Sequence, residues 1–355
     1  MSDQHDPLFS LSAHFSSLER PDASGVLTGT RAVGARARLV SLDYASIAQL
    51  AEQLVRQSGL QTDAQSTLVL PPWPAHYHFF DGTKRTVNWL LLLDALNFCF
   101  WGERGQARWQ IIYNGETLNG YWAEAAALRR AAEEGKPVWD ARYLSNIDAL
   151  QLASIFRGIS AQTPEIPLFE ERLRIAREVG QVLLERFDGQ FSQLIERAQQ
   201  SGVKLAQALA EHFSSFRDVA SYNGFEVRFL KRAQICVADL HSTFAGQAWG
   251  SFTDLDQLTI FADYKLPQVL RHHGALVYTP ELGARVDAQE ELTPGCAEEV
   301  EIRAATIWAC ELLRRAAVQL GAHALTAADV DQWLWHLGQD AEHMRPYHRV
   351  RTIYY

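Results

Sequence analysis

The segment that most constrains the fold is residues 87–101, which read VNWLLLLDALNFCFW and are apolar almost all round. A helix with this pattern has no polar face to turn toward water, so other elements must cover it on every side. We therefore predict a buried central helix. Its longest apolar run has 13 residues and contains Asp94 and Asn97. A membrane span needs about 20 apolar residues, so we expect a soluble protein.

Apolar residues recur at helical spacing through most of the remaining chain. The first such segment begins at Asp43, an expected N-cap, and continues to about Gln57. Residues 108–122 instead alternate β-forming side chains around Asn114-Gly115, which predicts a short hairpin. The other predicted helices, which Gly or Pro residues separate, span 121–134, 145–157, 168–187, 191–200, 203–213, 228–243, 298–320 and 326–338.

The predicted organisation is one mostly helical domain over residues 1–355 with a small β element. Its N-terminal segment, 1–40, is expected to be partly irregular, and 41–355 form the main domain. No linker rich in Gly, Ser or Pro divides the chain, and no repeat with a period of about 20 to 50 residues is present. Three prolines exclude a helix from PPWPAHYHFFDG (71–82), so this segment is expected to be a rigid connection where a site can be built.

Charge and cysteine usage exclude several classes of protein. The formal net charge is −9 and no run of five or more Lys and Arg occurs, so the footprint of a polynucleotide-binding protein is missing. The four cysteines form no C-x-x-C pair, which indicates reduced thiols. The first residues lack the basic and apolar regions of a secretory signal. We therefore expect a cytoplasmic protein.

The short motifs of common enzyme classes are also missing. The chain has no phosphate-binding loop, dinucleotide fingerprint, zinc-protease motif or nucleophile elbow. His272-His273 lacks a third ligand at metal spacing and is interpreted as a surface pair. We expect no metal and no redox cofactor.

Acids embedded in helices beside aromatic residues are the remaining candidates for chemistry. Asp331 follows a capping Thr326 and precedes Trp335 by four residues, with Gln332 and His336 on the adjacent stripe. An acid beside indole rings is in a setting that perturbs its pKa. Alternatively, Asp331 is a solvated acid near a helix N-terminus, and the residues alone favour this interpretation.

Asp263 lies in LTIFADYKLPQVLRHHGALVY (258–278), between two strongly apolar segments. An acid at this junction without a function would cost desolvation free energy. It would otherwise pair with Lys265 or cap a helix that opens at Leu266-Pro267. The sequence leaves both interpretations open.

Arg228, Lys231 and Arg232 open another amphipathic helix. Basic groups in a first turn oppose the helix dipole, so we expect a partner such as Asp218, Glu226 or a phosphate. A structural ion pair is the more frequent explanation of such a set.

Six stretches in the same order resemble one family, and the similarity runs from about residue 40 to the end. They are LDALNFCFW (93–101), FRD (216–218), FLKRAQICVAD (229–239), LTIFADYKLPQ (258–268), VEIRAATIWACELL (300–313) and YHRVRTIYY (347–355). Together they resemble the queuosine salvage family of queuosine 5'-phosphate N-glycosylases. The resemblance implies hydrolysis of the N-glycosidic bond of queuosine 5'-monophosphate, which releases queuine for reuse in transfer RNA.

The resemblance also implies a mainly α fold related to helix-hairpin-helix DNA glycosylases. Residues 254–274 have the outline of two short helices around a tight turn, with Pro267 restarting the second helix. In DNA-binding versions of this motif the hairpin contains glycines, and here Asp263-Tyr264-Lys265 stands in their place. We therefore expect a small-molecule nucleotide as the partner, with no duplex nucleic acid and no membrane. Two alternatives stay open, a DNA or RNA base-excision glycosylase and a non-catalytic protein that binds queuine or a nucleotide.

Carried over to this chain, the resemblance makes Asp331 the candidate nucleophile or cation stabiliser. Asp263 would bind the amino and imino edge of the 7-deazaguanine, and Phe261 with Trp335 would wall the base. His76 or His78 is a candidate ligand-binding histidine. The other substrate-binding candidates are Asn97, Tyr264, Gln332 and His336. Five basic residues are assigned to the 5'-phosphate on their charge: Arg228, Lys231, Arg232, Arg349 and Arg351.

Overall fold

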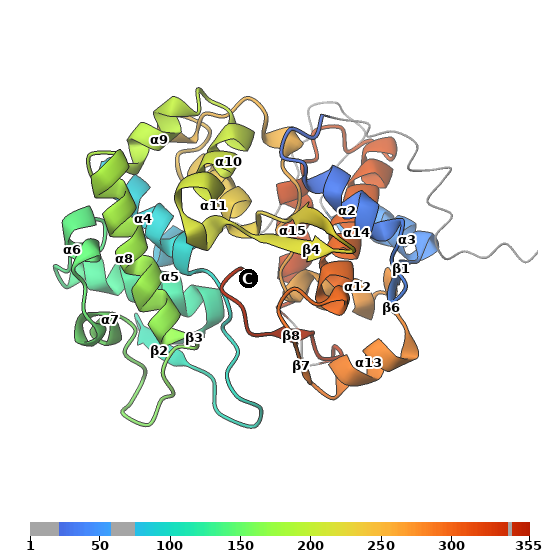
Figure 1. Cartoon of the computed structure of the whole chain (residues 1–355), viewed down its shortest axis with the longest axis horizontal. Helices are drawn as coiled ribbons and strands as arrows, with labels where there is room; N and C mark the ends of the chain where they lie inside the picture. Colours follow the sequence, from blue (N-terminus) through green and yellow to red (C-terminus); the bar gives the residue numbers. More distant parts are fainter. Residues whose placement is uncertain (1–20, 58–74, 340–342) are drawn as a thin grey trace, which may run out of the picture. The chain divides into compact units, whose positions relative to one another are not determined.

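The computed structural model describes residues 21–57, 75–339 and 343–355. It is mainly α, as predicted, and its strands form only short two-stranded pairs (Figure 1). The chain forms two compact units. Unit 1 comprises the described part of Met1–Pro72 with Val219–Lys231 and Leu255–Arg351, and unit 2 comprises the described part of Trp73–Asp218 with Arg232–Asp254 and Thr352–Tyr355. The single domain over 1–355 stays a prediction.

Unit 1 is built around one long helix. Its elements are α2 (Val26–Gly34), β1 (Val40–Leu42), α3 (Tyr44–Gln57), β4 (Val219–Tyr222), β5 (Phe225–Arg228), η4 (Leu255–Gln257), α12 (Lys265–His272), β6 (Leu276–Tyr278), α13 (Pro280–Asp287), β7 (Glu291–Leu292), α14 (Ala297–Gln319), α15 (Ala327–Leu337) and β8 (Arg349–Val350). Helix α14 is buried from Glu299 to Glu311 and contacts α2, α3, α12 and α15. It is therefore the core element on which the rest of unit 1 packs.

Unit 2 is built around the predicted apolar helix. Its elements are η1 (Ala75–Tyr77), α4 (Lys84–Leu96), β2 (Gln110–Tyr113), β3 (Glu116–Asn119), α5 (Gly120–Glu133), α6 (Ala141–Ser145), α7 (Ala149–Ile155), α8 (Phe169–Arg186), α9 (Phe191–Arg197), α10 (Gly202–His212), η2 (Ser214–Phe216), α11 (Lys231–Thr243, whose first residue belongs to unit 1) and η3 (Ala248–Gly250). Helix α4 is buried from Thr86 to Leu96, which confirms the expected central helix. No helix of the described residues is long and apolar enough to span a membrane.

Most predicted elements are present, including the hairpin β2–β3 with Asn114 and Gly115 at positive φ in its turn. Two helix predictions are partly wrong. The segment 145–157 is divided because Asp148 starts a new helix with a capping box. The segment 228–243 begins with the end of β5, and α11 starts only at Lys231.

The expected helix-hairpin-helix is only half formed. Helix α12 is present and carries Pro267 in its first turn, where proline is tolerated. The first of the two expected helices is reduced to the three-residue 3₁₀ helix η4, and residues 258–263 are irregular. Polar side chains therefore hold this irregular backbone in place of helical hydrogen bonds.

Two fully buried arginines satisfy the carbonyl groups that α4 leaves at its C-terminal end. The Arg172 guanidinium donates to the carbonyls of Leu96 and Phe98 and pairs with Glu124 at 3.0 Å. The Arg232 guanidinium donates to the carbonyls of Ala95 and Ser215. Because the last carbonyls of a helix have no partner within the helix, these two cations act as its cap.

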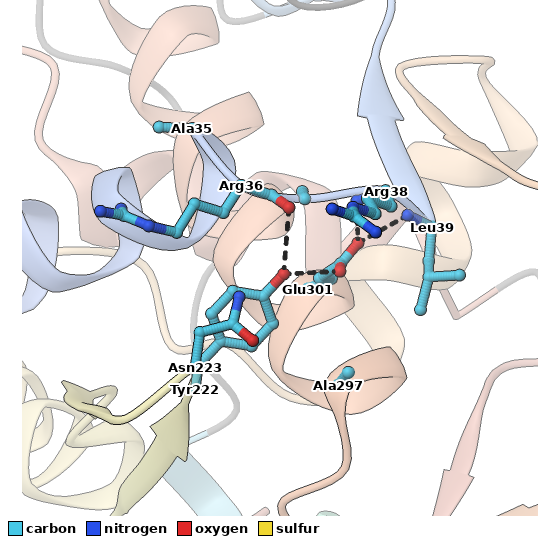
Figure 2. A pocket seen from close by; sticks show the side chains of 9 residues that line it. Ala35, Arg36, Arg38, Leu39, Tyr222, Asn223, Ala297 and Glu301 are labelled. Atoms are coloured by element: carbon cyan, nitrogen blue, oxygen red, sulfur yellow. Dashed lines mark hydrogen bonds between the residues drawn. The ribbon is translucent and has the colours of Figure 1, made fainter.

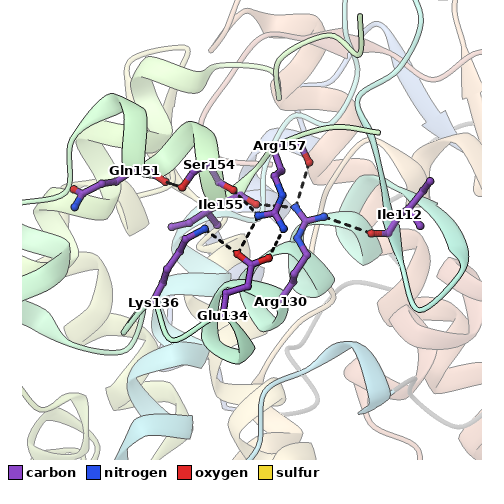
Figure 3. A network of polar contacts seen from close by, with 8 residues as sticks. All are labelled: Ile112, Arg130, Glu134, Lys136, Gln151, Ser154, Ile155 and Arg157. Carbon is purple, nitrogen blue, oxygen red and sulfur yellow. Dashed lines mark hydrogen bonds and ion pairs between the residues drawn. The ribbon is translucent and has the colours of Figure 1, made fainter. Parts of the chain in front are cut away.

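A surface network joins the C-terminal ends of α5 and α7 (Figure 3). The Glu134 carboxylate accepts hydrogen bonds from Arg157 and, at 2.9 Å, from Lys136. Arg130 donates to the carbonyls of Ile155 and Arg157 at 3.0 and 3.2 Å. The network therefore fixes the end of the short helix α7 against α5.

We predict that Arg172→Met lowers the free energy of unfolding by about 3–5 kcal/mol, the range for breaking one partner of a buried ion pair. The substitution removes the cation that faces Glu124 and the donors to the α4 carbonyls. Urea denaturation followed by circular dichroism measures the change. Arg174→Met is the matched control, because Arg174 lies on the same helix with its side chain 47% exposed. Equal losses in the two variants would contradict the capping role.

A pH-dependent contribution is expected from Glu134. Hydrogen bonds from Arg157, and then Lys136, hold the pKa of Glu134 at about 2, below its ordinary 4.5. A depressed pKa stabilises the fold above the ordinary value, and this contribution is lost as the pH falls from about 4.5 toward 2. Glu134→Gln should lower stability by at most about 1 kcal/mol at pH 7, because the pair is partly exposed.

The difference in Tm between wild type and Glu134→Gln should therefore be smaller near pH 3 than at pH 7. Glu185→Gln is the control, because this exposed glutamate on α8 forms no ion pair within the described residues. A Tm difference that is the same at both pH values would show that the charge of Glu134 is not what stabilises the network.

Candidate active site

Asp263 lies directly before α12 in unit 1 and uses one carboxylate oxygen to cap that helix. Its Oδ1 accepts the backbone N–H groups of Lys265 at 2.8 Å and Leu266 at 3.0 Å. Within the described residues Oδ2 forms no hydrogen bond. The cap that the sequence suggested is therefore present, and it uses only one of the two carboxylate oxygens.

The surroundings of Asp263 act on the pKa of its carboxyl group in opposite directions. Burial raises the pKa of Asp263 above its ordinary value, while the nearby Lys231 cation and the two N–H donors act to lower it. Lys231 is itself only 5% exposed. The Lys265 ammonium donates to the carbonyl of Gly338 at 3.0 Å and to Gln268 Oε1 at 3.2 Å. Asp263 thus lies in a setting that favours its neutral form more than water does.

Asp331 is close to the same turn. It lies on α15, is 8% exposed, and its Oδ1 accepts the backbone N–H of Phe261 at 2.8 Å. Burial raises the pKa of the Cys310 thiol on α14, and the negative charges of Asp331, Glu311 and Asp263 raise it further. The two candidate acids and Cys310 therefore share one neighbourhood. The interpretation of Asp331 as a solvated acid is wrong, because its side chain is buried.

The aromatic candidates lie around these acids on two segments. Phe261 is buried, while Trp335, His336 and Gln332 form a half-buried stripe on α15. The rings of Trp335 and His336 lie 5.5 Å apart, and burial lowers the pKa of His336. The half-buried Tyr264 ring lies 4.7 Å from that of Tyr347. Their binding of a base stays a prediction.

The basic candidates divide into surface and interior groups. Arg228 pairs with Glu226 at 3.0 Å, one of the partners suggested above. Arg349 and Arg351 both face Glu291, at 3.7 and 3.0 Å.

Arg232 belongs to the interior of unit 2, as described above. Burial lowers its pKa to about 10, and the nearby Asp218 opposes that change. Its hydrogen bonds are to carbonyls inside the protein, and the phosphate assignments stay predictions.

Unit 2 has a separate polar centre that contains one of the two candidate histidines. His78 is 7% exposed, and its Nε2 lies 2.9 Å from the hydroxyl of Tyr121, which donates to Asp239 Oδ2 at 3.4 Å. Burial raises the pKa of Tyr121 well above its ordinary value, with further contributions from Asp239, Asp94 and Glu124. His76 is exposed and its ring lies 4.0 Å from that of Tyr77.

Sequence reasoning missed Tyr121 and Asp239 as members of this centre. A signal was present in Asp94, a fully buried acid inside the apolar segment 87–101, because such an acid is rarely buried without a partner. Asn97, a substrate-binding candidate, is buried at the C-terminal cap of α4.

A cavity of about 790 Å³ in unit 1 has a lining that includes neither Asp263 nor Asp331 (Figure 2). The Glu301 carboxylate at this cavity accepts the N–H groups of Arg38, Leu39 and Val40 at 3.0, 2.7 and 3.3 Å, and the hydroxyl of Tyr222 at 2.8 Å. Its acceptor capacity is therefore used by the protein itself. We assign Glu301 a structural role, in which it fixes the start of β1 on α14.

No group of three or more His, Cys, Asp or Glu side chains that could hold a metal ion occurs within residues 21–57, 75–339 and 343–355.

Comparison with known proteins places the chain in a family. Residues 76–355 match the family profile described as queuosine salvage protein. Three similar proteins carry the name queuosine 5'-phosphate N-glycosylase/hydrolase. The one from Sphaerobacter thermophilus is 49% identical over 335 residues, which cover 94% of this chain and 98% of the relative. The one from Mus musculus is 40% identical over 281 residues, which cover 77% of this chain and 82% of the relative. The one from Bos taurus is 35% identical over 346 residues, which cover 93% of this chain and 99% of the relative. Because the profile match spans most of its length, this chain belongs to the queuosine salvage protein family.

Proposed function

We propose that this protein hydrolyses the N-glycosidic bond of queuosine 5'-monophosphate and releases queuine for reuse in transfer RNA. The observation that carries this proposal is the similarity to proteins named queuosine 5'-phosphate N-glycosylase/hydrolase, which extends over almost the whole chain at up to 49% identity. The protein is accordingly an N-glycosylase, a hydrolase that acts on N-glycosyl bonds, and its substrate is a small-molecule nucleotide.

The proposed role of Asp331 follows from the charge that develops during the reaction. Departure of the base leaves an oxocarbenium-like ribose, which a carboxylate stabilises or traps covalently. Asp331 is buried, and the N–H of Phe261 holds its Oδ1 in one orientation. A carboxylate that is already oriented and shielded from water loses little free energy in reorganisation when the cation forms.

The proposed role of Asp263 follows from the chemistry of the leaving base. A 7-deazapurine carries carbon at position 7, so protonation there cannot assist its departure. The protein must act through the other polar atoms of the base. Asp263 Oδ2 is left for such an atom by the capping geometry, and burial raises the pKa of this carboxyl. Two carboxylates in different environments can divide the tasks at the ribose and at the base.

The remaining substrate-binding assignments are part of the same proposal. They comprise Phe261 and Trp335 as walls of the base, and His76, His78, Asn97, Tyr264, Gln332, His336, Lys231 and Arg232 as further ligand contacts.

We predict that Asp331→Asn reduces hydrolysis of queuosine 5'-monophosphate at least a hundredfold, while queuine binding changes little. Asparagine retains the acceptor for the Phe261 N–H but loses the negative charge that stabilises the ribose cation. Free queuine is quantified by mass spectrometry after incubation with the nucleotide. The wild-type protein must release queuine, since unchanged nucleotide would identify a binding protein.

Asp239→Asn is the comparison variant, because Asp239 is the carboxylate of the polar centre in unit 2. Full turnover in Asp331→Asn together with its loss in Asp239→Asn would transfer the catalytic assignment from Asp331 to Asp239.

We predict that Asp263→Asn weakens queuine binding by about tenfold or more. Loss of a hydrogen bond to a charged group costs about 1.5–3 kcal/mol, and 1.4 kcal/mol is a factor of about ten. Asparagine can keep Oδ1 as the cap of α12 while Oδ2 becomes a donor, so the fold is preserved. Isothermal titration with queuine measures the affinity. Asp263→Ala, which also removes the cap, should lower Tm in addition, and wild-type affinity in both variants would exclude Asp263 from base recognition.

A further inference from the structure

Arg303 on α14 contacts both segments that carry the charged groups around the candidate site. Its Nε donates to the carbonyl of Ala262 at 3.0 Å, and its guanidinium carbon lies 4.0 Å from the centroid of the Phe229 ring. Ala262 directly precedes Asp263, and Phe229 precedes Lys231 by two residues. One buried side chain therefore contacts the backbone directly before Asp263 and the aromatic ring two residues before Lys231.

The irregular backbone at 261–263 has a bond to a different element at each position. Phe261 donates its N–H to Asp331 on α15, Ala262 accepts from Arg303 on α14, and Asp263 caps α12. Because this segment has no helical hydrogen bonds, these contacts set the direction in which the Asp263 carboxylate points. Removal of the bond to Ala262 would release the residue that directly precedes Asp263.

The chemistry of arginine suits this task. A guanidinium can stack on an aromatic ring and donate a directed hydrogen bond at the same time, whereas an ammonium is a point charge without a stacking face. Arg303 is 2% exposed, and its Nη1 lies 4.0 Å from Glu299 Oε1. Burial of a charge is costly unless it is compensated, so the ring, the carbonyl and the carboxylate together explain why this cation is tolerated.

We propose that Arg303 is a positioning residue that acts through Asp263, holding the carboxylate at the orientation and the separation from Lys231 that recognition of the leaving base requires. This proposal rests on the proposed function. In this positioning role Arg303 does not touch the reacting atoms. Its effect on hydrolysis should therefore disappear when Asp263 can no longer bind the base.

The test is a double-mutant cycle on kcat/KM for queuosine 5'-monophosphate with Arg303→Met, Asp263→Asn and the combined variant. Arg303→Met alone should lower kcat/KM by about tenfold, whereas the same substitution in the Asp263→Asn background should change it by less than about twofold. Equal effects in the two backgrounds would overturn the proposal, because a general structural role of Arg303 would add to the loss of Asp263.

Arg315→Met is the matched control for lost stability. Arg315 is also a buried arginine on α14, pairs with Glu311 at 2.9 Å and lies 5.8 Å from the Trp308 ring centroid. We expect both arginine variants to lower Tm, and only Arg303→Met to lower kcat/KM. A matching loss of kcat/KM in Arg315→Met would overturn the specific role.

Arg303→Lys is the second variant, in case Arg303→Met does not fold. Lysine keeps the charge and the apolar stem but loses the stacked planar donor, so kcat/KM should again fall by about tenfold and wild-type kcat/KM would overturn the proposal. If the wild-type protein releases no queuine, the proposed function fails. If Asp263→Asn alone has no effect while wild type is active, the assignment of Asp263 fails and the positioning role of Arg303 fails with it.

Discussion

Hydrogen bonds from buried guanidinium groups to backbone carbonyls are the interaction on which the irregular parts of this structure depend. Arg172 and Arg232 cover the carbonyls at the end of α4, and Arg303 binds the carbonyl of Ala262. A buried carbonyl without a hydrogen-bond donor costs free energy, and so does a buried cation without an acceptor. A hydrogen bond between the two removes both costs. The chain can therefore end its central helix, and hold an irregular segment, inside the protein.

This interaction also explains why basic residues were difficult to assign. Arg232 lies one position after Lys231 in the sequence, yet the two side chains serve different purposes. Arg232 caps α4 within unit 2, whereas Lys231 lies beside Asp263 in unit 1. Adjacent residues on a helix point about 100° apart, so a run of positive charge indicates no common ligand. The partner of each cation depends on a segment far away in the sequence.

The parts of the fold that local patterns determine could be predicted, and the parts that distant contacts determine could not. The all-round apolar character of 87–101 identified α4, and Asn114-Gly115 identified the β2–β3 hairpin. The same signal at Asn223-Gly224, in the β4–β5 hairpin, was overlooked. For the site, Asp263 and Asp331 were found as acids in apolar surroundings. The bond from Asp331 to Phe261 joins residues 70 positions apart, and no local pattern could reveal it.

Asp263 shows how a helix cap and a proposed ligand contact can coexist in one carboxylate. The sequence left a helix cap and a ligand site as alternatives, but a carboxylate has two oxygens and the cap uses only Oδ1. The cap holds Oδ1, while Arg303 holds the carbonyl of the residue directly before Asp263. In the proposed function, the oxygen that the cap does not use contacts the base. Because folding already fixes Oδ1, binding of the base in the proposed function need not supply all of the free energy of orienting this carboxylate.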